Sequence, residues 1–69
     1  MKSIIVHDLN LLGNPSMFIN VNAISAVKRE YSARGYYTVI YVGEFIFRVA
    51  EDFDTIMQKI KEAESGGET

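Results

Sequence analysis

The chain has no cysteine and a single histidine, His7, among its 69 residues. Without cysteine no disulfide can stabilise the fold, and one imidazole without thiolates cannot supply the ligands of a structural zinc site. A chain of this size buries only about 60 % of the surface that its unfolded state exposes. Its stability therefore has to come from close packing or from self-association. The absence of cysteine also fits a reducing compartment, so we expect a cytoplasmic protein.

Long apolar runs and an excess of basic residues are also missing. The apolar run near the N-terminus, Ser3 to Val6, is too short for a signal peptide or a membrane span. Seven Lys and Arg against nine Asp and Glu give a net charge of −2, which provides no general attraction for nucleic acid or anionic lipid. We therefore expect a soluble protein with one domain, residues 1–64, followed by a disordered tail, residues 65–69.

The apolar residues that are present follow the pattern of short β-strands. Strands are predicted over residues 2–7, 17–21, about 25–31, and the two arms of a hairpin within residues 36–49. Turn-forming segments separate them, namely "DLNLLGNPS", "NVNAIS", "SARG" and "GE". Gly35 suits a positive φ, and Gly43 stands where a two-residue type II′ turn requires glycine.

One amphipathic helix is predicted from about Phe53 to Ala63, with Asp52 as its N-cap. Its apolar residues fall on one face, and they are Phe53, Ile56, Met57, Ile60 and Ala63. The predicted fold class is α+β. We expect an antiparallel sheet of four or five strands with one C-terminal helix packed on one face.

The hairpin "YYTVIYVGEFIFRV" is apolar on both of its faces. With a turn at "GE", alternation predicts a core face under the helix, formed by Val27, Thr38, Ile40, Val42, Phe45, Phe47 and Val49. The opposite face is predicted to hold Ala26, Lys28, Glu30, Tyr37, Val39, Tyr41, Ile46 and Arg48. One helix covers only one face of a sheet, so this second face meets either water or another protein.

Tyrosine and arginine among apolar neighbours are enriched at protein interfaces. We therefore predict an interface made of Lys28, Tyr37, Val39, Tyr41, Ile46 and Arg48. The expected partner is a second copy of the chain, in a dimer or a larger homo-oligomer, or else another protein. The alternative is an ordinary solvated face that cross-strand pairs stabilise.

The same face suggests single-stranded nucleic acid as an alternative ligand. Tyr37 and Tyr41 with nearby cations resemble the stacking platforms that bind single strands. Glu30 and Glu44 lie among these residues, and the whole chain is acidic, so the pattern favours a protein partner over nucleic acid.

Residues for catalysis, metal binding or cofactor binding are not predicted. His7 and Asp8 have no second histidine or cysteine to complete a ligand set, and the serines lack a suitable base. Capping and the helix dipole explain the acids Glu51, Asp52 and Asp54. The isolated glycines match no phosphate-binding loop. We expect a protein that is not an enzyme.

From about residue 19 to residue 60, the order of features resembles the small FlbD-type flagellar-operon proteins. The stretches "FINVNAISAV", "TVIYVGEFIFRVAED" and "DTIMQKI" carry the resemblance as a strand and turn, a hairpin and a capped helix. The longer "DLNLLGNPS" departs from the tight strand–turn–strand of that family. The same middle stretch is similar to the first half of LytTR-type DNA-binding domains, whose later strands and base-contacting residues have no counterpart here. Neither resemblance assigns a functional residue.

Overall fold

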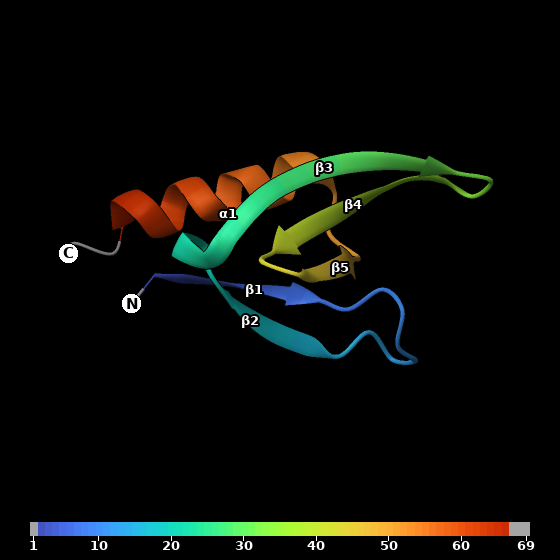
Figure 1. The fold of residues 1–69 in the computed structure, drawn as a ribbon, viewed down its shortest axis with the longest axis horizontal. Helices are drawn as coiled ribbons and strands as arrows, with labels where there is room; N and C mark the ends of the chain where they lie inside the picture. Colours follow the sequence, from blue (N-terminus) through green and yellow to red (C-terminus); the bar gives the residue numbers. More distant parts are fainter. Residues whose placement is uncertain (1, 67–69) are drawn as a thin grey trace.

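The computed structural model describes residues 2–66, which form five strands and a C-terminal helix (Figure 1). The strands are β1 (Ser3–His7), β2 (Ser16–Asn20), β3 (Ile24–Ser32), β4 (Gly35–Val42) and β5 (Phe45–Val49). A 3₁₀ turn, η1 (Val21–Ala23), precedes β3, and the helix is α1 (Phe53–Gly66). The α+β class and the C-terminal helix are confirmed.

The strands form two antiparallel sheets, β1–β2 and β3–β4–β5, and not the single sheet of four or five strands that we expected. The sheets meet only where β1 ends, at one bridge between Asp8 and Val49. The amide of Leu9 donates to the Arg48 carbonyl at 2.9 Å, and the amide of Ala50 donates to the His7 carbonyl at 2.8 Å. Turn-forming residues begin directly after His7, so the chain leaves this pairing after one step.

The core lies between the two sheets and the helix. Its buried apolar side chains are Ile4, Val6, Ile19, Val21, Ile40, Val49 and Ile56. Because β1 and β2 cover part of the three-stranded sheet, α1 lies beside β1, η1 and β3. A narrower stripe of the helix is therefore covered than we expected. Ile56 is fully buried, whereas the side chain of Met57 is 43 % exposed.

The backbone conformations of the two hairpin turns agree with those predicted from their glycines. Gly43 has φ of 58°, and Glu44 is not among the described residues with positive φ, as a type II′ turn requires. Gly35 also has a positive φ, of 115°. The helix continues to Gly66, so Ser65 and Gly66 are helical and not part of an unstructured tail. Residues 67–69 of that expected tail lie outside the described residues.

The two ends of the molecule are formed by different elements (Figure 1). The loop between β1 and β2 and the turn between β3 and β4 lie at one end, and the C-terminal part of α1 lies at the other. Residues 2–66 include no helix that has both the length and the apolar character needed to cross a membrane.

Candidate functional site

The outer face of the three-stranded sheet brings together all six residues of the predicted interface. Lys28 pairs with Val39 and Val39 with Arg48, while Tyr41 pairs with Ile46. Glu30 pairs with Tyr37 on the same face. We call these seven residues the outer face, and they are Lys28, Glu30, Tyr37, Val39, Tyr41, Ile46 and Arg48.

Glu30 lies at the centre of a polar network on the outer face. Its carboxylate accepts hydrogen bonds from the hydroxyls of Tyr37 and Tyr41, at 3.2 and 3.4 Å, and pairs with the Lys28 ammonium at 3.3 Å. The hydrogen bond from Lys28, supported by those from the tyrosines, holds the pKa of Glu30 below its ordinary value. The hydrogen bond to Glu30 raises the pKa of Lys28 in turn. The sequence placed Glu30 on this face but gave no sign that it links three neighbours.

Two cations lie over the tyrosine rings of the outer face. The Lys28 nitrogen is 5.6 Å from the centre of the Tyr41 ring, and the Arg48 guanidinium is 5.6 Å from the centre of the Tyr37 ring. Val39, which lies between these long side chains, is only 2 % exposed. Neighbouring side chains already cover Val39, so it offers little surface of its own to a partner, and its place in an interface stays a prediction. Ile46 remains 60 % exposed and is the main apolar contact that the outer face offers.

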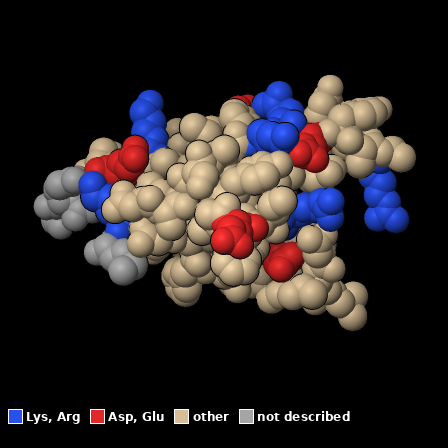
Figure 2. Space-filling model, in the orientation of Figure 1, with Lys and Arg blue, Asp and Glu red and all other residues tan. Residues whose placement is uncertain are grey.

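Figure 2 shows basic and acidic side chains scattered over one side of the molecule, with uncharged surface between them. Basic side chains lie at the end that holds the β3–β4 turn. Arg34 belongs to that turn, and Arg48 lies in the neighbouring strand β5. On this side of the molecule, the basic side chains therefore do not form the continuous track that nucleic-acid backbones select.

A second candidate surface is a groove at the end of the molecule where the β3–β4 turn lies. The pairing of β4 with β5 starts at Thr38, so the segment Gly35–Tyr37 extends beyond β5. Across from this segment, Leu9 and Asn10 of the β1–β2 loop form the other wall. The groove has a volume of about 460 Å³, and we call it the tip groove. Its residues come from distant parts of the chain, so the sequence pattern gave no signal for it.

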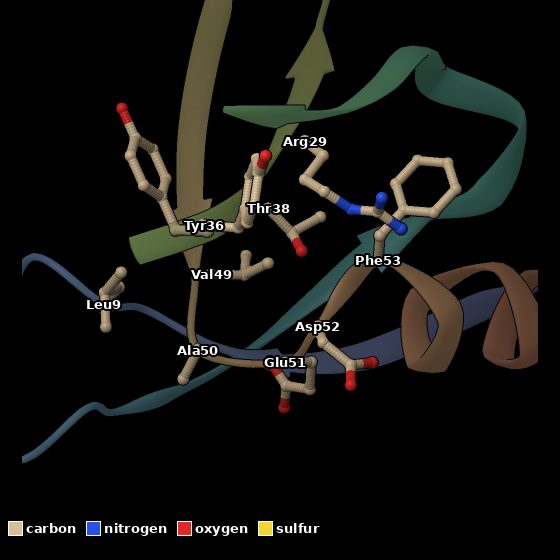
Figure 3. Close-up of a pocket in the computed structure, with 10 residues that line it drawn as sticks. Leu9, Arg29, Tyr36, Thr38, Val49, Ala50, Glu51, Asp52 and Phe53 are labelled. Carbon is tan, nitrogen blue, oxygen red and sulfur yellow. The ribbon is translucent and has the colours of Figure 1, made fainter. Parts of the chain in front are cut away.

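A smaller pocket of about 190 Å³ lies next to the tip groove (Figure 3). The Arg29 guanidinium extends over the Phe53 ring there, 5.1 Å from its centre. Thr38 contributes to the wall, and its hydroxyl is buried without a hydrogen-bond partner among the described residues. Asp52 is used for capping, since its carboxylate accepts the Thr55 amide at 2.8 Å. Hydrogen bonding from the Thr55 side chain, together with this backbone hydrogen bond, lowers the pKa of Asp52.

His7 and Glu51 form a pair that joins β1 to the segment before α1. The Glu51 carboxylate lies 2.6 Å from Nδ1 of His7 and also accepts the His7 backbone amide at 3.0 Å. Burial raises the pKa of Glu51, but these hydrogen bonds outweigh burial and hold it below its ordinary value. Sequence reasoning assigned Glu51 to the helix dipole and missed the pair, because its members are 44 positions apart.

The pair does not extend into a metal site within the described part of the chain. Residues 2–66 bring together no group of three or more His, Cys, Asp or Glu side chains suited to a metal ion. Comparison of the chain with protein-family models, with curated proteins and with solved structures finds no match to any of them. The resemblances drawn from the sequence therefore stay predictions.

Proposed function

We propose that this chain is a small non-catalytic module that associates with a second copy of itself through the outer face. The observation that carries the proposal is Ile46, which is 60 % exposed beside a network whose polar groups already bind one another. Side chains held in place before docking lose little conformational entropy when a partner arrives. The outer face can therefore bury an apolar contact without leaving polar groups unpaired.

A second copy is favoured by the charges of the outer face and by the size of the core. The face presents Lys28 and Arg48 together with Glu30, so two copies related by a two-fold axis can place opposite charges against each other. The core contains seven buried apolar side chains, which is a small number for an independent domain. Burial of the outer face in a dimer would add to this limited stability.

A different protein could bind the outer face in place of a second copy. Single-stranded nucleic acid is the alternative from a different class, and the geometry disfavours it. Lys28 and Arg48 already lie over the ring faces on which bases would stack, and the Glu30 carboxylate lies between the rings.

The test is the solution mass, measured by light scattering across a dilution series. We expect a dimer that Ile46→Glu converts to a monomer, with an unchanged circular-dichroism spectrum. Ile5→Glu is the matched control, because Ile5 is 45 % exposed on β1, outside the outer face. Tyr41 is less suitable for this test, since a new charge there would break its hydrogen bond to Glu30.

A wild-type protein that stays monomeric at every concentration would contradict self-association. A dimer that survives Ile46→Glu but not Ile5→Glu would contradict the choice of face. Fluorescence titration with a single-stranded oligonucleotide tests the nucleic-acid alternative. That alternative requires binding that weakens steeply as the salt concentration rises.

A further inference from the structure

The tip groove combines two arginines with an absence of acids. Arg34 and Arg48 both line it, and no Asp or Glu is among the described residues that do so. Neither guanidinium forms an ion pair within the part of the chain that the structure describes. In a chain with a net charge of −2, this is a local site of positive charge without an acidic partner among the described residues, although Arg48 also lies over the Tyr37 ring. Such a site complements carboxylates, which arginine can bind through two parallel hydrogen bonds.

Apolar side chains surround the two arginines. Leu9 is 42 % exposed and Tyr36 is 71 % exposed, and both line the tip groove. Tyr31 packs edge-on against Tyr36 with ring centres 5.1 Å apart, and Leu11 and Leu12 belong to the same loop as Leu9. Five of the ten large apolar side chains that are exposed among the described residues thus lie at this end (Figure 1). Exposed apolar residues gathered in this way mark an interaction site.

The backbone beside the tip groove is suited to an extended ligand. Because the segment Gly35–Tyr37 extends beyond β5, β4 has a short edge there that β5 does not pair with. Extended peptides bind such edges by adding a strand, with alternate side chains in the flanking pockets. A ligand of this kind can place acidic side chains towards the arginines and apolar ones towards Leu9.

We propose that the tip groove binds an extended acidic segment of a partner protein. Its carboxylates bind Arg34 and Arg48, and an apolar side chain of the segment packs between Leu9 and Tyr36. A nucleic-acid backbone fits less well, because two cations do not provide the series of phosphate contacts that gives such binding its affinity. This inference goes beyond the proposed function, since it concerns a groove that shares only Tyr37 and Arg48 with the outer face, and a foreign partner.

The test uses fluorescence anisotropy with the full chain and a labelled peptide of alternating glutamate and leucine. We expect saturable binding below about 1 mM that weakens with added salt. The double variant Arg34→Glu, Arg48→Glu should lower the affinity by about tenfold or more. The matched control is Lys59→Glu, Lys61→Glu on α1, which changes the net charge equally away from the groove and should stay within about twofold.

Four results would overturn the proposal. They are no saturation by about 1 mM peptide, an equal loss of affinity in the α1 control, equal binding of a lysine–leucine peptide, or tighter binding of a single-stranded oligonucleotide. The amide spectrum of the protein adds a second measurement that does not depend on a variant's folding. The peptide should shift the amide signals of Leu9, Gly35 and Tyr36, and shifts confined to other residues would contradict the site.

Because Ile46→Glu leaves the tip groove intact, peptide binding by that variant distinguishes failure of this inference from failure of self-association.

Discussion

Two buried polar side chains, Thr38 and Glu51, show how single residues depart from what their sequence neighbourhood suggests. Thr38 is 1 % exposed on the core face, and its hydroxyl has no partner within residues 2–66. Glu51 is mostly buried but binds both the ring and the backbone of His7. A polar group that loses water without gaining a partner lowers stability, whereas one that gains two partners does not.

Thr38→Val is expected to raise the free energy of unfolding by about 1 kcal/mol, because it removes an unpaired buried hydroxyl and keeps the β-branched shape. Urea denaturation measures the change. Ser3→Ala, which removes an exposed hydroxyl from β1, should change stability by less than about 0.5 kcal/mol. A loss of stability in Thr38→Val would show that the hydroxyl does have a partner, such as an ordered water.

Glu51→Gln is expected to lower the free energy of unfolding by about 1 kcal/mol at neutral pH, because a neutral amide replaces a carboxylate that binds His7 twice. The pKa of Glu51 is lower in the folded chain than its ordinary value of 4.5. Its stabilising effect is therefore complete above that value and is lost as the pH falls through the lowered pKa.

Urea denaturation across this acidic range checks the Glu51 prediction. The difference between wild type and Glu51→Gln should shrink as the pH falls below 4.5. Glu44→Gln, in the exposed β4–β5 turn, is the control and should show a smaller effect. A stability difference that stays constant down to the lowest pH would contradict a stabilising role for the ionised Glu51 carboxylate.

At the scale of elements, the parts of the fold that the sequence predicts are those with local causes. The β4–β5 hairpin follows from alternation and from Gly43, and α1 follows from its Asp52 cap and its apolar spacing. The two-sheet arrangement and the exposure of Met57 have no such local cause. They depend on where β1 and β2 lie against β4, β5 and α1, and periodicity does not encode that position.

The helix offers a direct comparison between neighbouring positions. Ile56→Ala should lower the free energy of unfolding by about 3 kcal/mol, since Ile56 is fully buried in the core. Met57→Ala should cost less than about 1 kcal/mol, because Met57 is 43 % exposed. Thermal or urea denaturation of both variants measures the difference. Equal costs would show that Met57 also contacts the core, as the sequence alone suggested.

At the scale of the whole molecule, the two sheets share one core and are hydrogen-bonded to each other at one short junction. The bridge between Asp8 and Val49 carries the hydrogen bonds of the Leu9 and Ala50 amides. Asp8 and Leu9 come from a segment that the sequence marks only as a turn, so their pairing with β5 was not predictable. The two candidate surfaces also differ in whether the sequence predicts them. Alternation along the strands predicts the outer face, but the tip groove arises from tertiary packing of distant segments.

Hydrogen exchange should reveal the role of this connection. We expect the amides of Leu9 and Ala50 to exchange slowly, because their hydrogen bonds close the junction where the end of β1 pairs with β5. The Asn14 amide binds the Leu11 carbonyl within an exposed loop and should exchange much faster. Exchange of Leu9 and Ala50 at the rate of Asn14 would show that the sheets separate without unfolding.

Arg48 belongs to both candidate surfaces. Its guanidinium lies over the Tyr37 ring on the outer face, and it also lines the tip groove. A carboxylate that draws Arg48 away from Tyr37 would alter the face that we propose pairs with a second copy. Thermodynamic reciprocity then requires that, if the acidic peptide weakens dimerisation by some factor, dimerisation weakens peptide binding by the same factor. If both proposals hold, the Arg48 side chain would couple the assembly of this 69-residue chain to the binding of a ligand.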